Sequence, residues 1–303
     1  MTIPRIRLSV KDWEGELLVA QDGLEFCFYM QQSHDTLRAG VRQALDLYLK
    51  VMGKESLNSA PDSDGYWQPL DAAAWSAIHQ KLHNPLWASV ALAGQDRTGD
   101  RFGFEYRGHA FSHPDDFRGP DAVSALRVSF PTKILEAHGP ERIRGWALEM
   151  AQPLPFSYGH AGLCFNGYPT ASTVRDEAKR LAFRHPAMDV INLDDVARDL
   201  GTHVRAPAWM NFLGPPVLNE LGGTDALRSR LHSPGTTVQA IGQDRAVVTL
   251  GPYPEAGDTE QGQTLPAYRE LARVLEPWLY QTSGPEDSDL FDSTRRWQRR
   301  FLD

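Results

Sequence analysis

The chain has 303 residues, enough to bury a large core and more than the roughly 100–200 residues usual for one domain. With 41% hydrophobic and 23% charged residues, its composition is that of a folded globular protein and excludes extensive disorder. The net charge of −8 disfavours direct binding of nucleic acid, which needs a cationic surface; it suits a basic protein partner, although mild acidity also serves solubility alone.

The first half of the chain is predicted to interleave strands and helices. Residues 24–30 are read as apolar on both faces, the pattern of a central strand. Asp35 is placed to cap a helix that ends at Gly53, and Asp71 to cap a second helix that ends near residue 82. A hairpin is expected from residues 87–93 and 102–106, and an irregular stretch, 109–120, follows it.

The second half shows a more regular pattern. Strands are expected at residues 126–130, 160–165 and 204–212, with a hairpin at 237–241 and 245–250. Helices are expected at 140–150, from 173, at 216–221, at 224–231 and at 265–280. This order predicts an α+β, or mixed α/β, fold with an antiparallel or mixed sheet and packed helices. Its expected parts are an N-terminal subdomain at 1–120, a C-terminal subdomain at 121–282 and a polar tail at 283–303.

The cysteine pattern and the N-terminal sequence indicate the compartment. Cys27 and Cys164 each lie in an apolar run, where a thiol behaves as a small hydrophobic group, and two such residues do not form a disulfide framework. The sequence has no secretory leader and no apolar run of about 20 residues that would span a membrane. We therefore expect a cytoplasmic protein without membrane contact.

Motifs of common enzyme classes are missing from the sequence. It contains no phosphate-binding loop, no dinucleotide-binding glycine motif and no H-E-x-x-H. Ser157 is the nearest approach to a nucleophile elbow, but Pro155 stands where that turn requires glycine. The sequence thus predicts no catalytic residue, no metal and no cofactor.

Three groups of histidines leave alternatives open. His79 and His83 have a spacing that can bind metal, but no third ligand is evident, and a helix C-terminus also favours histidine. His160, between two glycines, is read as a structural histidine because no nucleophile accompanies it. An enzyme of unknown type would use His160 or a loop cluster of metal-ligand types, made up of His109, His113, Asp115 and Asp116.

The eight tryptophans are more than the core of a chain of this length needs. Trp75, Trp146 and Trp278 lie on apolar helical stripes and are expected inside. Trp67 and Trp297 lie among polar residues. Each could be an exposed side chain that binds a partner protein, or a side chain that packs its own segment onto the rest of the protein.

Four blocks of sequence carry a family resemblance. They are LRVSFPTKILEAHGPERIRGWALEMAQPLPFSYGHAGLCFN at 126–166, RHPAMDV at 184–190, APAWMNFLGPPVLNELGG at 206–223 and GPYPEAGD at 251–258. Through them the chain resembles type VI secretion immunity proteins that pair with nuclease toxins of the virus-type replication-repair class. The resemblance extends more weakly over residues 24–280. The positions that carry the pattern, most of them expected to be structural, are Gly159, Gly162, Trp209, Gly214, Gly251 and Asp258.

The resemblance implies a function in binding and no catalytic residues. An immunity protein neutralises its cognate nuclease toxin in the cytoplasm of the producing cell by tight association. Because a nuclease is basic around its DNA groove, acidic loops are the expected contact surface. The predicted partner-binding residues are Asp62, Asp64, Trp67, Asp115, Asp116, Asp194 and Asp195. A scaffold protein is the remaining class, which strong self-association without a toxin would indicate.

Overall fold

The computed structural model describes residues 3–11, 15–96, 99–111, 119–281 and 289–302, with side chains of the last range described from residue 292. Every strand of this described part joins one antiparallel sheet, in the order β10-β11-β9-β8-β2-β7-β6-β5-β3-β4, with β1 beside β2. The first strands are β1 (Arg7–Lys11), β2 (Glu16–Met30), β3 (Ser59–Pro61), β4 (Trp67–Pro69), β5 (Ala88–Gln95) and β6 (Arg101–Gly108). The others are β7 (Ser124–Pro131), β8 (Tyr158–Gly167), β9 (Met210–Leu213), β10 (Thr236–Ile241) and β11 (Arg245–Leu250).

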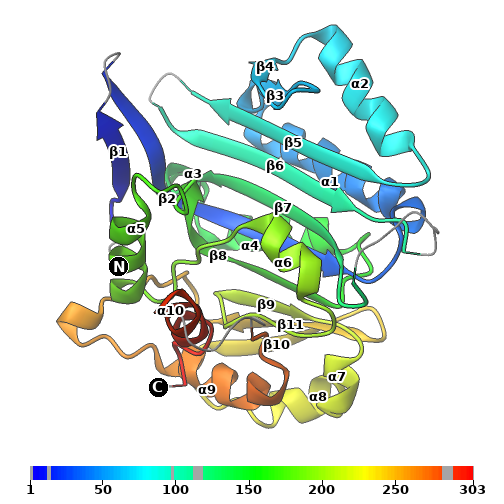
Figure 1. Ribbon diagram of the computed structural model, residues 1–303. Helices are drawn as coiled ribbons and strands as arrows, with labels where there is room; N and C mark the ends of the chain where they lie inside the picture. The colour runs from blue at the N-terminus through cyan, green and yellow to red at the C-terminus, as the bar shows by residue number, and fades with distance from the viewer. Residues whose placement is uncertain (1–2, 12–14, 97–98, 112–118, 282–288, 303) are drawn as a thin grey trace.

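Helices cover the sheet, and the predicted α+β class is confirmed. The earlier helices are α1 (His34–Met52), α2 (Ala72–His83), α3 (Lys133–His138), α4 (Pro140–Ala151) and α5 (Arg175–Arg184). The later ones are α6 (Leu193–Asp199), α7 (Val217–Glu220), α8 (Gly223–Arg228), α9 (Pro266–Leu275) and α10 (Asp289–Gln298). In Figure 1, α1 and α4 lie behind the sheet, whereas α6 and α10 lie in front of it.

The central strand β2 divides the core into two parts. Leu24, Phe26 and Phe28 point to one side of the sheet, where they join a core that includes apolar residues of α1 to α5. Cys27 and Tyr29 point to the opposite side, where α6 to α9 bury their apolar residues. This alternation is the period-two geometry of a strand, and it places every second β2 residue on the side that carries the candidate site.

The sheet runs without interruption through both predicted subdomains. β2 pairs with β7 and β8, and β7 also pairs with β6. How the chain divides into subdomains stays a prediction. The predicted hairpin of β10 and β11 is confirmed. Both cysteines are buried and free. No helix within the described ranges is both long and apolar enough to cross a membrane.

The predicted strand at 204–212 is wrong over most of its length. Only Met210–Leu213 is a strand, although Val204 forms an isolated bridge with Leu279. Pro207 has no N–H for a ladder, and the side chain of Asn211 holds the backbone N–H of Ala208 at 2.9 Å. The predicted last helix also ends early, since residues 276–278 form a 3₁₀ turn that contains Pro277.

Candidate functional site

A cluster of charged side chains lies on the α6 side of the sheet. It consists of Glu25, Arg127, His160, Asp189 and Arg205, and we call it the polar cluster. Strand register brings its first three members together, because Cys27 of β2 stands opposite Arg127 of β7 and opposite His160 of β8.

Arg127 joins two carboxylates of neighbouring strands. Its Nε donates to Glu25 at 2.8 Å, and its Nη1 donates to Glu105 of β6 at 3.0 Å. Burial acts to lower the pKa of Arg127, but the charges of Glu25 and Glu105 outweigh it and raise that pKa well above its usual value. Glu25 and Arg127 therefore form an ion pair inside the sheet layer.

His160 lies between two carboxylates. Its Nε2 is 3.6 Å from Glu25 and 3.5 Å from Asp189. The ring is 1% exposed, and neither of its nitrogens has a hydrogen-bond partner within the described residues. Tyr29 and Tyr158 stack on each other, and their ring centroids lie 6.1 Å and 5.8 Å from that of His160.

Asp189 ties the cluster to the end of the chain. Arg205 donates to both of its oxygens at 2.9 Å, and Arg300 lies 3.6 Å away. Burial acts to raise the pKa of Asp189, but Arg205, Arg300 and His160 lower it to about 2. Burial lowers the pKa of Arg300 to about 10, against the opposing effect of Asp189.

The arrangement offers little for catalysis. Cys27 and Cys164 are nucleophilic side chains beside it, and burial raises the pKa of both thiols, which keeps them protonated. Glu25, Arg127, His160 and Asp189 are buried, and the side chain of Arg205 is 11% exposed.

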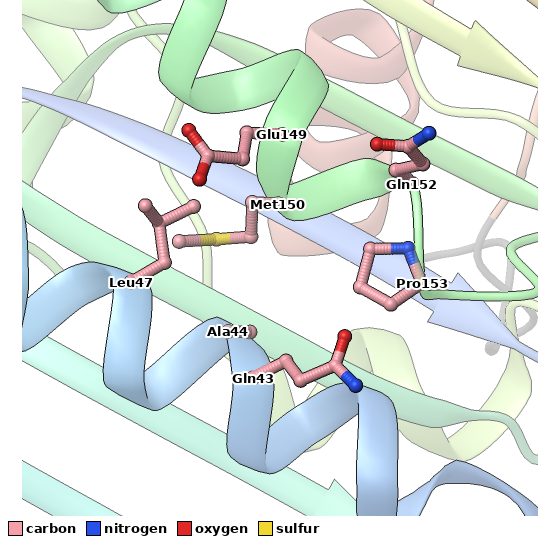
Figure 2. A pocket seen from close by; sticks show the side chains of 7 residues that line it. All are labelled: Gln43, Ala44, Leu47, Glu149, Met150, Gln152 and Pro153. Atoms are coloured by element: carbon pink, nitrogen blue, oxygen red, sulfur yellow. The ribbon is translucent and has the colours of Figure 1, made fainter.

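Two surface hollows lie away from the polar cluster. One, of about 280 Å³, lies between α1 and α4; Figure 2 shows Leu47 facing Met150 there, with Glu149 at its edge. A larger hollow, of about 670 Å³, is lined by glutamines and prolines, with Asp244 and Arg245 as its charged residues. Neither hollow contains a histidine or a cysteine among its lining residues.

The turn between β3 and β4 holds Asp62 and Asp64, and Trp67, the third predicted partner-binding residue here, begins β4. Asp62 accepts hydrogen bonds from the backbone of Asp64 and Tyr66 and from the side chain of Gln68. The bond from Gln68 lowers the pKa of Asp62, with the backbone bonds adding to it. Asp64 is exposed, Tyr66 is 70% exposed and Trp67 is 45% exposed. Carboxylates and aromatic rings therefore share one projecting turn.

The other predicted acidic pairs differ in their surroundings. Asp194 and Asp195 lie in the first turn of α6; Asp194 is bound by Arg107, and Asp195 lies 3.5 Å from Arg198. Asp115 and Asp116, with His113, lie outside the described residues. His109 is buried, and its backbone carbonyl accepts from the N–H of His34 at 2.7 Å.

His83 is engaged at both ring nitrogens. Nδ1 contacts the backbone oxygen of His79 at 2.6 Å, and Nε2 contacts Arg42 at 3.0 Å. This arrangement is that of a helix-end histidine and leaves no ring nitrogen of His83 for a metal.

The family-pattern positions have distinct structural surroundings. A Cβ at Gly214 would lie 2.2 Å from the backbone oxygen of Phe156, and Gly159 and Gly162 also lie against neighbouring segments. The indole N–H of Trp209 donates to the carbonyl of Gly251, whose φ is +81°. Asp258 caps a 3₁₀ turn and binds Arg184 at 2.9 Å.

The sequence profile of the TsiV family, described as type VI immunity for VRR-NUC, matches residues 40–301. The chain belongs to this family. The resemblance inferred from the sequence blocks is thereby confirmed.

The fold has a solved counterpart. A Pseudomonas aeruginosa T6SS protein, PA0821, superimposes with a TM-score of 0.77 at 20% identity, covering 97% of this chain and 87% of that one. At this identity the likeness shows the fold alone. No curated protein matches the chain.

Sequence reasoning missed most of the polar cluster. Glu25 and Arg127 are charged residues inside otherwise apolar strand patterns, and that interruption was the one available signal. Asp189, Arg205 and Arg300 come from irregular segments or the chain end, so their convergence depends on tertiary structure.

Proposed function

We propose that the chain is an immunity protein that binds a cognate VRR-NUC nuclease toxin and neutralises it by tight association. The match of the immunity family to residues 40–301 carries this proposal. The burial of Glu25, Arg127, His160 and Asp189 supports a function without turnover, because these side chains are not presented to a substrate in solution. The toxin acts on DNA, so we place the encounter in the cytoplasm of the producing cell.

The β3–β4 turn is our proposed contact surface. A nuclease carries positive charge where it binds DNA phosphates, and carboxylates opposite that charge accelerate association. Trp67 and Tyr66 add exposed aromatic area, of the kind that forms interface hot spots once it is desolvated. Asp62 already organises the turn, which leaves Asp64 as the carboxylate that can contact a partner.

Asp194 and Asp195 form a second, weaker candidate surface. Arg107 already binds Asp194, so part of its charge is neutralised within the chain. Asp195 is the more available of the two.

Variants of the turn test this surface. We expect Asp64→Lys and Trp67→Ala each to weaken toxin binding by about tenfold or more, equivalent to about 1.4 kcal/mol, as measured by calorimetry or biosensor. Asp225→Lys is the matched control, because Asp225 is 94% exposed and lies on α8, far along the sheet from the turn.

Rescue of cell growth tests the function itself. Cells that produce the cognate VRR-NUC toxin should grow when this chain is co-expressed and die when it is not. Unrescued cells that contain folded chain would refute the immunity function. Rescue combined with unchanged binding of both turn variants would refute only the proposed surface.

A further inference from the structure

Three metal-ligand side chains meet inside the sheet layer. Ligand atoms of Glu25, Cys27 and His160 all lie within 4.8 Å of one another, and all three residues are buried. Glu25 and Cys27 lie on the same side of β2, and His160 stands directly opposite Cys27 on β8. Two paired strands of the central sheet therefore fix this geometry.

Polar atoms at this point lack protein partners. Glu25 Oε1 and both ring nitrogens of His160 have no hydrogen bond within the described part of the chain. Folded proteins rarely leave such atoms unsatisfied, and each one needs a ligand or a water. Arg127 holds the other oxygen of Glu25 at 2.8 Å, so the carboxylate is already oriented toward His160.

We propose that Glu25, Cys27 and His160 form a buried binding site for a single zinc-type divalent cation. Thiolate, imidazole and carboxylate together are the ligand set of borderline-soft ions such as Zn²⁺ and Co²⁺. Mg²⁺ and Ca²⁺ prefer all-oxygen sites and are not expected here. Asp189 is a further carboxylate beside the site, with an oxygen 3.5 Å from His160 Nε2.

Binding requires the loss of one proton. The Cys27 thiol releases its proton to solvent as the sulfur–metal bond forms. Affinity should therefore fall as the pH is lowered.

The surrounding charges limit the affinity. Within the polar cluster, Glu25 and Asp189 balance the guanidinium groups of Arg127 and Arg205, and Glu105 and Arg300 at its edge add one charge of each sign. A dication with one new thiolate adds one net positive charge. We therefore expect the ion to bind more weakly here than at a closed site of several cysteines. We also expect the ion to enter during folding, before Arg300 and the C-terminal segment cover the cluster.

Cobalt substitution tests the site, independently of any toxin. The full chain is refolded with Co²⁺, dialysed and examined for a thiolate-to-cobalt charge-transfer band and for metal content. We expect one ion per chain and that band in the wild type. We also expect a higher Tm for wild type refolded with Zn²⁺ than for wild type refolded with a chelator.

The two cysteines provide a matched control. Cys27→Ser should lose the band, whereas Cys164→Ser should retain it, since Cys164 is equally buried and close to Glu25 and Arg127 but is not one of the three residues whose ligand atoms meet. Wild-type chain without the band, without bound metal and without a Tm shift would overturn the proposal, whether or not the variants fold. Metal that remains at full stoichiometry in folded Cys27→Ser would show surface binding and would also overturn it.

Discussion

Asp189 is the residue on which several parts of the molecule converge. Its oxygens contact Arg205 and Arg300, and its backbone forms a bridge to Cys164 of β8. Removing one partner of a buried ion pair leaves the opposite charge without compensation, which costs about 3–5 kcal/mol. We expect Asp189→Asn to lower the free energy of unfolding by about that amount in urea denaturation. Asp195→Asn, at an exposed position, is the control and should change it little.

Asp189 also makes the free energy of unfolding depend on pH. Arg205, Arg300 and His160 overcome the effect of burial and lower the folded-state pKa of Asp189 to about 2, below its usual 3.8. A lowered pKa contributes stability that is present above the unfolded-state value and is lost as the pH falls toward the folded-state value. The difference between wild type and Asp189→Asn should therefore be constant above about pH 5 and shrink between about pH 4 and pH 2. A difference that stays constant to pH 2 would contradict this assignment.

Gly214 tests the close contact between two segments of the family pattern. A methyl group there would lie 2.2 Å from the carbonyl oxygen of Phe156, so the backbone must shift. We expect Gly214→Ala to destabilise the fold by about 2 kcal/mol or more, as measured by urea denaturation. Gly145→Ala is the opposite control: Gly145 lies within α4 with open space around it, and this change should stabilise the fold by up to about 1 kcal/mol.

Sequence patterns predicted apolar burial better than the polar contacts. Cys27 and Cys164 were expected inside and lie there. The pairing of Arg127 with Glu25 spans 102 positions, and no local pattern carries that information. The apolar pattern of residues 24–30 includes Glu25, although a charge that is buried needs a partner.

Among the elements, the C-terminal segment differs most from its prediction. Its sequence predicts a polar tail, but several of its side chains pack against the body of the protein. Phe301 is 1% exposed and packs against Tyr268 of α9 with ring centroids 5.4 Å apart. Trp297 contacts Phe183 of α5, and Arg300 donates to the backbone of Pro186. Phe301 is thus part of the core on the α6 side of the sheet, whereas Trp297 packs against the core of the opposite side.

Truncation of one ring tests this packing. We expect Phe301→Ala to lower the free energy of unfolding by about 3–5 kcal/mol, because it removes a fully buried aromatic side chain. Leu17→Ala, at a position that is 54% exposed, should change stability by less than about 0.5 kcal/mol. Equal stability of the Phe301 variant and wild type would show that the segment is not part of the cooperative core.

Element prediction succeeded where the determinants were local. The β10–β11 hairpin follows from two alternating runs and a short turn, and it forms as expected. The strand expected from residue 204 fails because Pro207 interrupts the ladder and Asn211 bonds to Ala208. A side chain that competes for backbone groups is difficult to recognise from an alternating pattern.

At the scale of the whole molecule, one antiparallel sheet joins the two halves and buries its charged cluster. The central sheet therefore serves stability and, in our proposal, holds a metal ion. The exposed turn between β3 and β4 lies at one end of this sheet, where a large partner can approach it.

Inhibition of DNA cleavage by the purified chain tests the central claim most directly. The cognate VRR-NUC toxin would be titrated with the chain, and cleavage of a DNA substrate would be measured at each molar ratio of chain to toxin. We predict that cleavage falls in proportion to the amount of chain added and stops near one chain per toxin, because binding is tight and needs no turnover. Full cleavage in the presence of excess folded chain would contradict the account.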